Sequence, residues 1–199
     1  MINGVDVSSY NPNLDYAQLA KSGVAFAWCK CSEGATVLDK MHDQHTTGFR
    51  AAGVRTGSYC FGHTSQDAAA TADFFLANAT IDQLKPVIDM ETLSQGRVPD
   101  NAGEWCLAWL ERVERITGIR AIIYASTSYL AAMIKQCPAL SAYDVWLAEY
   151  HVPPSPDRLP KVTRMVAWQW SGSGTLPGAP TPIDRDVLIV DSLDDVSVT

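Results

Sequence analysis

The sequence predicts an α/β fold, an irregular single-domain parallel β/α barrel of eight strands with fewer helices in its second half. Strand-like runs alternate with helical segments along the 199 residues, without an internal repeat or a low-complexity tail. Of these residues 47% are apolar and 19% are charged, which suits one globular domain with a buried core. Barrels of this kind usually take roughly 250 residues, so some connections must be abbreviated.

Eight short runs rich in β-branched and aromatic residues are predicted to be the strands. In chain order they are Gly4–Val7, Val24–Cys31, Val54–Phe61, Pro86–Glu91, Ala121–Ala125, Val145–Tyr150, Met165–Trp170 and Ile183–Ile189.

Three segments between these runs are predicted to be helices: residues 39–53, 66–79 and 102–117. The last carries apolar residues at intervals of four, four and three: Trp105, Trp109, Val113 and Ile116. These residues share one helix face, so both tryptophans are expected in the core. Gly118 follows as a left-handed cap. Further on, seven prolines between residues 151 and 182 leave little room for crossover helices.

The net charge of the chain argues against some classes of binding partner. Lys and Arg total 15 against 22 Asp and Glu, which gives a net charge of −7 with no basic cluster. Nucleic acid and anionic membrane are therefore not expected as partners. No apolar run approaches the roughly 18 residues of a membrane span. The N-terminus lacks a secretory signal, so we expect synthesis in the cytoplasm without a Sec address.

Metal and nucleotide sites are not indicated. The five cysteines are odd in number and show no ligand spacing, which favours buried thiols in a reducing compartment. They are Cys29, Cys31, Cys60, Cys106 and Cys137. The four histidines are scattered, and neither a glycine-rich nucleotide motif nor a serine-hydrolase elbow occurs. We therefore expect no metal and no cofactor.

Acidic residues stand at the ends of several predicted strands, where a parallel barrel gathers its reactive groups. They are Asp6, Asp89, Glu91, Glu149, Asp184 and Asp186. Asp89 and Glu91 are two apart on one strand, so both project to the same side. Like charges this close raise at least one pKa, which lets one carboxyl act as a general acid while the other stays ionised. By itself an Asp-x-Glu pair is a weak signal, because such acids also cap turns.

Aromatic residues gather at the remaining strand ends. They are Tyr59, Phe61, Tyr124, Trp146, Tyr150, Trp168 and Trp170. Sugar rings stack their apolar faces on such side chains, while Tyr hydroxyls and Gln amides can bond sugar hydroxyls and acetamido groups. The pattern favours a carbohydrate groove. The alternative for Trp146 and Trp168 is that they only fill the barrel.

Taken in order, eight segments closely resemble glycoside hydrolase family 25, the Chalaropsis-type lysozymes found in phage endolysins and bacterial autolysins. They are Gly4–Asn11, Trp28–Gly34, Gly53–Phe61, Val87–Glu91, Ile122–Ala125, Val145–Tyr150, Ala167–Gln169 and Ile183–Val187. One such segment could match by chance, but eight in the right order do not. The resemblance spans nearly the whole chain, so residues 1–199 are expected to be one glycoside hydrolase catalytic domain of phage endolysin type.

The resemblance implies an irregular α/β barrel that hydrolyses the β-1,4 bond between N-acetylmuramic acid and N-acetylglucosamine in peptidoglycan. By motif, Glu91 resembles the general acid. Asp89 resembles its partner, acting either as a nucleophile or by orienting the acetamido group of the substrate; both routes retain configuration. Two further acids and six substrate contacts are expected from the resemblance and the aromatic pattern: Asp6 and Asp184, then Tyr59, Tyr124, Trp146, Tyr150, Trp168 and Gln169.

Two positions depart from the family pattern. Cys60 stands where the family usually has a histidine, and Asp186 stands where it usually has an asparagine. The general acid is untouched by both. An extra carboxyl at Asp186 could shift the pH profile or the preferred substrate, so no role is carried over to it.

Two other functions compete with a muramidase. One is a catalytically silent barrel that grips peptidoglycan or chitin without cutting it, although a pure binder would not need both Asp89 and Glu91. The other is a chitin-type N-acetylhexosaminidase, although the chitinase pattern D-x-x-D-x-D-x-E is not met. We expect a monomer that acts on the bacterial cell wall after holin-type release or lysis.

Overall fold

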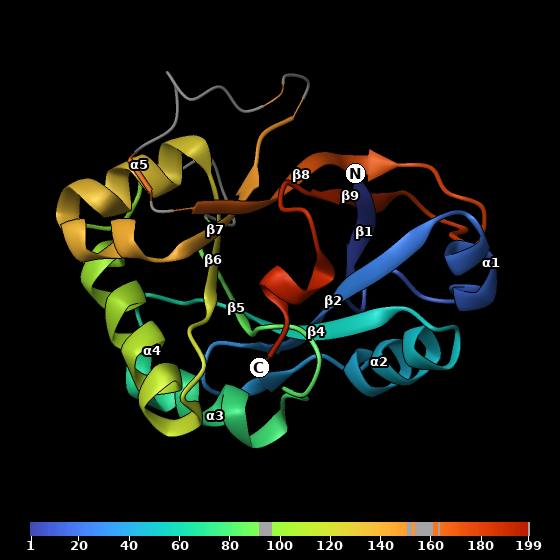
Figure 1. The fold of residues 1–199 in the computed structure, drawn as a ribbon. Helices are drawn as coiled ribbons and strands as arrows, with labels where there is room; N and C mark the ends of the chain where they lie inside the picture. The colour runs from blue at the N-terminus through green and yellow to red at the C-terminus, as the bar shows by residue number, and fades with distance from the viewer. Residues whose placement is uncertain (92–96, 151–152, 154–160, 163, 199) are drawn as a thin grey trace.

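The structure, a computed structural model, describes residues 1–91, 97–150, 153, 161–162 and 164–198. Its strands and helices alternate for most of the chain (Figure 1). The strands are β1 (Ile2–Val7), β2 (Val24–Glu33), β3 (Val37–Leu38), β4 (Arg55–Phe61), β5 (Val87–Asp89), β6 (Ile122–Ser126), β7 (Asp144–Ala148), β8 (Arg164–Gly174) and β9 (Ile183–Leu188). The helices are α1 (Tyr16–Lys21), α2 (His42–Ala51), α3 (Ala68–Asn78), α4 (Ala102–Thr117) and α5 (Thr127–Gln136), with short 3₁₀ turns η1 (Pro138–Ala142) and η2 (Leu193–Val196).

Eight of these strands close into a barrel, which confirms the predicted fold. The order is β1-β2-β4-β5-β6-β7-β8-β9, and β9 returns to pair with β1, while β3 is a short addition to β2. Seven barrel strands, β1, β2 and β4 to β8, pair in parallel. Only the last barrel strand, β9, departs from this order, because it runs antiparallel to both β8 and β1. Its first residues therefore lie where the parallel strands end.

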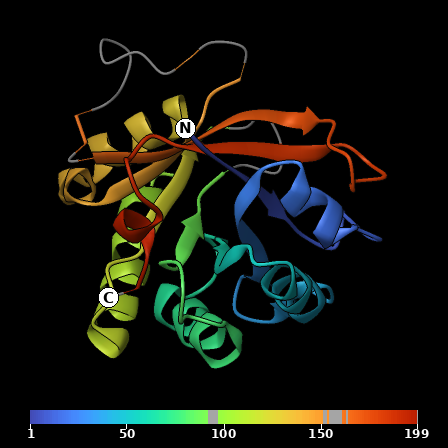
Figure 2. The ribbon, with the colours of Figure 1, turned by 45° about the vertical axis from the view of Figure 1, so that its right-hand side comes forward.

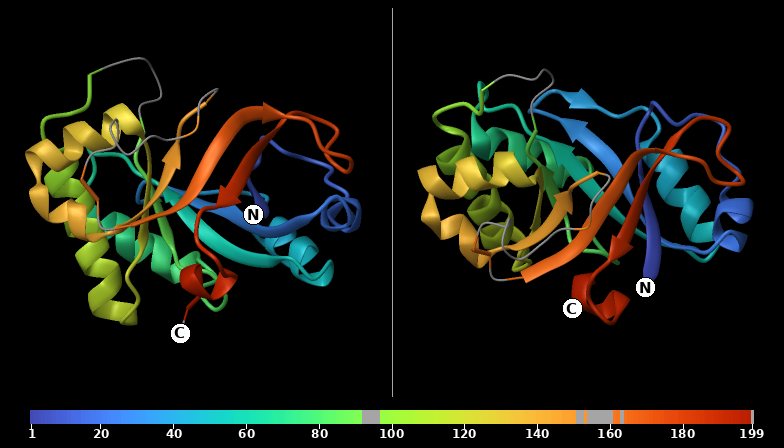
Figure 3. Two further views of the ribbon diagram at one scale, coloured as in Figure 1. Left: turned by 45° about the horizontal axis from the view of Figure 1, so that its top comes forward. Right: turned by 90° about the horizontal axis from the view of Figure 1, so that it is seen from above.

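The helices lie on two sides of the barrel, with α1 and α2 against β1 and β2 and with α3, α4 and α5 on the other side (Figures 1 and 2). The three predicted helices are confirmed as α2, α3 and α4. Two helices were missed. α1 is only six residues long, and α5 begins directly after β6, since Ser126 ends the strand and its side chain also caps the helix by accepting from Tyr129 N at 3.3 Å. In the described parts of the chain after β7, no α-helix occurs, as predicted (Figure 3).

Side chains on alternating strand positions build two kinds of core. The outer core lies between the sheet and α3 to α5 and includes Phe75, Trp105 and Trp109, so the expectation for both tryptophans is confirmed. Ile116, predicted on the same face, is instead 51% exposed, because it lies in the last turn of α4 beyond the packed region. Gly118 then ends the helix at φ 74°, as predicted.

The inner core fills the barrel itself. It contains Phe26, Trp28, Tyr59, Leu84, Val87, Ile122, Tyr124, Trp146, Val166, Ala167, Leu188 and Val196. Two glycines, on the two strands that flank β2, make room for the largest rings. A Cβ at Gly4 would lie 2.2 Å from the Phe26 ring, and one at Gly57 would lie 2.6 Å from the Trp28 indole. Glycine is therefore needed at both positions by close approach.

The C-terminal segment covers the end of the barrel at which the parallel strands begin. Val196 of η2 packs into the inner core, and its carbonyl accepts from Lys85 N at 2.8 Å. Charged groups close this end in pairs: Arg164 bonds Asp144 at 2.9 Å and Asp195 at 3.1 Å. The opposite end of the barrel, where β1 to β8 finish, is left open for a site.

All five cysteines are free and buried. Across the helices of the described residues, none combines the length and the apolar character that a membrane crossing requires.

Candidate active site

Four carboxyl groups converge on one recess at the C-terminal ends of the parallel strands. Asp6 comes from β1, Asp89 ends β5, Glu91 follows two residues later, and Asp184 comes from the start of β9. The recess has a volume of about 430 Å³. Asp184 was predicted at a strand end, but it reaches this rim from the beginning of its strand because β9 is antiparallel.

Asp89 and Glu91 face the recess together, as their spacing predicts, while Met90 between them points into the outer core. Asp89 is buried, with 6% of its surface exposed, whereas Glu91 is open to solvent. Among the described residues, Asp89 Oδ1 has no hydrogen-bond partner. The pair therefore combines a buried carboxyl with an accessible one.

The carboxyls of the recess have pKa values above their usual range. Burial raises the pKa of Asp89 well above its usual value, the charge of Glu91 raises it further, and Lys30 lowers it. Burial also raises the pKa of Glu91, with Asp184 adding to the effect and Lys30 opposing it. Burial raises the pKa of Asp184 to about 6. Carboxyls this close do not all ionise near neutral pH, so the recess keeps a proton available.

Gln169 links two tyrosines to Asp6. The hydroxyls of Tyr124 and Tyr150 donate to Gln169 Oε1 at 2.9 and 2.6 Å, and Gln169 Nε2 donates to Asp6 Oδ2 at 2.6 Å. All four side chains line the recess. Gln169, on β8, thereby fixes the orientation of both tyrosine hydroxyls and of the Asp6 carboxyl.

Asp186 lies behind the recess and is 1% exposed. Trp146 Nε1 donates to Asp186 Oδ1 at 2.9 Å. Burial raises the pKa of Asp186 well above its usual value, and the charge of Asp184 adds to this. Although Trp146 reaches the recess, its ring is 2% exposed and stacks on Trp28 at 4.6 Å. Trp146 therefore fills the barrel and anchors Asp186, and its sugar contact stays a prediction.

The remaining predicted contacts divide into two groups. Tyr59 lines the recess and is 8% exposed. Trp168 is not among the described residues that line a recess; its indole donates to the Glu149 carbonyl at 2.7 Å. It alternates with Gln169 along β8, which places the two side chains on different faces. The structure therefore does not bring Trp168 to the acids.

A cation that was given no role in the sequence analysis also lines the recess. Lys30 Nζ bonds Glu33 Oε2 at 2.7 Å and lies 4.8 Å from the centre of the Phe61 ring. His63 Nε2 is 2.9 Å from Glu33 Oε1. Lys30 could have been found from its place in a strand whose neighbours, Cys29 and Cys31, are buried.

Cys60, the first departure from the family pattern, does not touch the recess. It lies in the outer core, while Tyr59 and Phe61 on either side of it line the recess. The missing histidine at this position therefore leaves the lining of the recess unchanged.

Glu91 stands where two recesses meet. A second recess of about 600 Å³ shares Glu91, Tyr124 and Tyr150 with the first. It extends toward the start of α5 and includes Glu149, whose carboxylate accepts from the Thr127 hydroxyl. A linear polymer can therefore pass Glu91 with a sugar unit on either side of it.

Within the described residues, no group of three or more His, Cys, Asp or Glu side chains has an arrangement that could hold a metal ion. The chemistry of the recess is therefore derived from its carboxyl, hydroxyl and amide groups.

Comparisons with known proteins agree with this geometry. Lysozyme M1 of Streptomyces globisporus is 25% identical over 199 residues, covering 93% of this chain and 67% of that protein. A family 25 glycosyl hydrolase of Bacillus anthracis superposes with a TM-score of 0.83 at 25% identity, covering 98% and 92% of the two chains. A bacterial lysozyme of Streptomyces coelicolor has the same fold, with a TM-score of 0.86 at 23% identity over 97% and 94%. The sequence model of the family 'Glycosyl hydrolases family 25' matches residues 5–179. The chain therefore belongs to that family.

Proposed function

We propose that this protein is a muramidase of the lysozyme type, which hydrolyses the β-1,4 bond between N-acetylmuramic acid and N-acetylglucosamine in bacterial peptidoglycan. The observation that carries the proposal is the pairing of buried Asp89 with accessible Glu91 at the junction of two recesses in a family 25 barrel. The relative from Streptomyces globisporus, named a lysozyme, supports this substrate. The site of action is accordingly the bacterial cell wall.

Glu91 is the general acid. Its carboxyl is accessible to a glycan, and burial with the charge of Asp184 raises its pKa, which favours the protonated form needed at the start. Glu91 protonates the glycosidic oxygen, the bond from that oxygen to C1 breaks, and an oxocarbenium-like transition state forms. Water then adds to C1, and its proton returns to Glu91.

Asp89 is the partner carboxyl. It either attacks C1 or orients the acetamido group of the substrate, which then attacks C1 from within the sugar. Asp6 and Asp184 adjust the pKa values of the pair and hold sugar or water. The groups of Tyr59, Tyr124, Tyr150 and Gln169 that line the recess contact the sugar on this proposal.

Digestion of defined peptidoglycan, followed by borohydride reduction and mass analysis, tests the proposal. A muramidase leaves reduced muramic acid at the new ends. Reduced glucosamine instead would favour the chitin-type activity, and an absence of new reducing ends would favour the silent barrel.

The assignment of Glu91 is tested by Glu91→Gln, for which we expect a loss of at least about 10³-fold in turnover with glycan binding retained. Glu111→Gln, a substitution of an exposed acid on α4, is the matched control and keeps the wild-type rate. Release of reducing sugar by Glu91→Gln at the wild-type rate would overturn the assignment.

A further inference from the structure

A third recess lies beside the acidic one, on the far side of Tyr150. It has a volume of about 400 Å³ and is lined by Tyr150, Trp170, Ser171, Gly172 and Ser173. Tyr150, two residues after β7, is 43% exposed, and Trp170, on β8, is 37% exposed. Tyr150 also lines both recesses that contain Glu91, so the third recess adjoins them at this side chain.

The Trp170 ring is supported from one side. The guanidinium of Arg185 lies 5.0 Å from the centre of this ring, and Arg185 Nη1 donates to the Thr175 carbonyl at 3.3 Å. Arg185 packs across Gly174, where a Cβ would lie 2.3 Å from its Cγ. The cation–π contact and the packing hold the ring in one orientation and leave its exposed surface to solvent.

The backbone of β8 approaches Tyr150 closely at Gly172. A Cβ at this position would lie 3.1 Å from the Tyr150 hydroxyl and 3.5 Å from Asp184 Oδ1. Glycine at this position therefore lets the β8 backbone lie directly against Tyr150 and Asp184, between the third recess and the acids.

We propose that this third recess is a further sugar subsite, in which Trp170 stacks on an N-acetylhexosamine ring of the glycan strand some distance from the cleaved bond. Two aromatic side chains beside the Ser171 and Ser173 hydroxyls match a pyranose, which has apolar C–H faces and a polar edge. The occupant is inferred from Tyr150, which this recess shares with the two recesses that contain Glu91, and so rests on the proposed muramidase function. Occupation of this subsite strengthens binding of long strands and leaves the chemical step unchanged.

The test compares kcat and KM on peptide-free glycan strands of increasing length. For Trp170→Ala we expect KM to rise about five- to tenfold on long strands, with kcat unchanged and no effect on the shortest fragment that is cleaved. Trp170→Tyr keeps an aromatic face and recovers most of the affinity. Arg185→Gln, which removes the support, gives a smaller rise of about two- to threefold. Ile116→Ala, at an exposed apolar residue of α4, is the control without effect.

An equal KM for wild type and Trp170→Ala at every strand length would overturn the subsite, even if the muramidase function stands. A second arm repeats the comparison on strands that still carry stem peptides. A rise in KM seen only in that arm would also overturn the subsite, because the recess would then hold peptide. If the wild-type protein cuts no glycan, titration with N-acetylglucosamine oligomers by calorimetry decides the question separately. Weaker binding of long oligomers by Trp170→Ala then supports the subsite, and unchanged binding contradicts it.

Discussion

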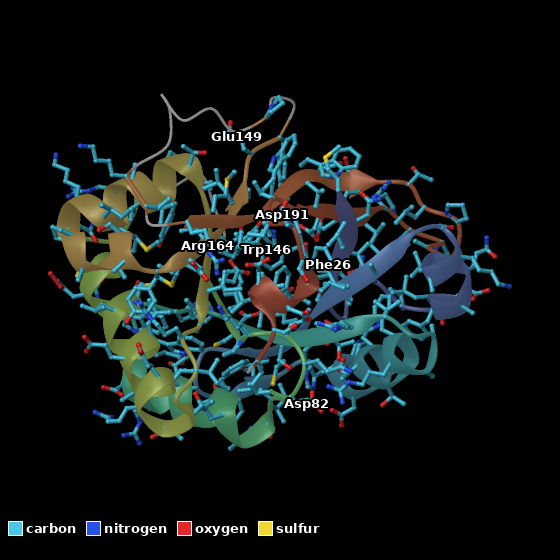
Figure 4. All side chains as sticks on the ribbon, viewed as in Figure 1. Phe26, Asp82, Trp146, Glu149, Arg164 and Asp191 are labelled. Atoms are coloured by element: carbon cyan, nitrogen blue, oxygen red, sulfur yellow. The ribbon has the colours of Figure 1, made fainter. Side chains whose placement is uncertain are left out.

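At the end of the barrel where β7 and β8 begin, Asp144 lies between two cations, Arg164 at 2.9 Å and Lys85 at 3.4 Å. At the end where the same strands finish, the carboxyls of the recess face mostly one another, and Lys30 is the one cation among the described residues that line it. Carboxyls are therefore paired with cations at one end of the barrel and mostly unpaired at the other. In Figure 4 the side chain of Trp146 lies near the centre of the molecule, with Arg164 of β8 beside it and Glu149, the residue after β7, near the top of the view.

The pKa values follow the pairing. Burial would raise the pKa of Asp144, but the hydrogen bond and charge of Arg164, with Lys85, lower it below its usual value. Burial raises the pKa values of Asp6, Asp89 and Asp186, and no comparable cation compensates. Paired charges at one end stabilise the fold, whereas unpaired carboxyls at the other reduce stability near neutral pH and keep protons available for chemistry. The comparison teaches that cations around a carboxyl, and not its burial alone, decide in which direction its pKa shifts.

The largest expected effect is on activity, which should depend on the carboxyls at one end of the barrel and not on those at the other. Asp89→Asn removes the partner carboxyl and should reduce kcat on peptidoglycan by about 10²-fold or more. Asp144→Asn should stay within about twofold of wild type, because Asp144 is at the other end of its strands. Initial rates of reducing-sugar release measure both variants. Equal losses of activity in the two variants would show that catalysis does not depend on one end of the barrel alone.

The second effect is on stability, which we expect to fall in Asp144→Asn but not in Asp89→Asn. Asp144→Asn leaves Arg164 and Lys85 without their shared carboxylate and should reduce the free energy of unfolding by about 1–3 kcal/mol at pH 7. Asp89→Asn removes an unpaired buried carboxyl and should leave stability unchanged or higher. Urea unfolding followed by circular dichroism measures the difference. A stability loss in Asp89→Asn alone would contradict the comparison.

The dependence of stability on pH should report both the raised pKa of Asp184 and the lowered pKa of Asp144. The folded-state pKa of Asp184 is raised from 3.8 to about 6, so its contribution to stability is complete below its unfolded pKa and is lost as pH rises through about 6. The pKa of Asp144 is lowered, so its contribution is present above 3.8 and is lost as pH falls through the folded value. Tm should therefore rise by about 3 °C from pH 7 to about pH 5 and fall in stronger acid.

Asp184→Asn is the matched variant for this curve, and it should flatten the rise between pH 7 and pH 5 without changing the fall in acid. Thermal unfolding across pH checks this. A rise of the same size in Asp184→Asn would assign the effect to other groups.

The smallest expected effect concerns Asp186. Asp186→Asn keeps an oxygen that can accept from Trp146 Nε1 and removes a buried carboxyl whose pKa is raised. We expect a gain in stability of about 1 kcal/mol at pH 7.5 that disappears near pH 4, where the carboxyl is already protonated. Calorimetric unfolding at the two pH values measures it. A gain of equal size at both values would point to packing instead of charge.

Much of the site could be predicted from local pattern. The two-residue period of a strand predicted Asp89 and Glu91 on one side and Met90 on the other. The structure has them so, although the strand predicted over Pro86–Glu91 ends at Asp89. The same rule identified Asp6 as a strand acid. These features depend on neighbours in sequence, and the sequence by itself determined them.

Other features depend on which strands pair and in which direction. Asp184 and Asp186 reach the acids only because β9 runs antiparallel. Gln169 joins Tyr124 to Asp6 across the closed barrel, and Trp146 turns inward onto Trp28. Strand direction and barrel closure are set by contacts between residues far apart in the chain, which a local pattern does not contain.

The acidic pair was thus determined by the sequence, through the two-residue period of a strand. Its environment was decided by the tertiary structure: the burial of Asp89, the exposure of Glu91 at the junction of two recesses, and the scarcity of cations around them. The physical reason is that a carboxyl's pKa depends on the solvent and charges that surround it, and here these come from strands spread over the whole chain.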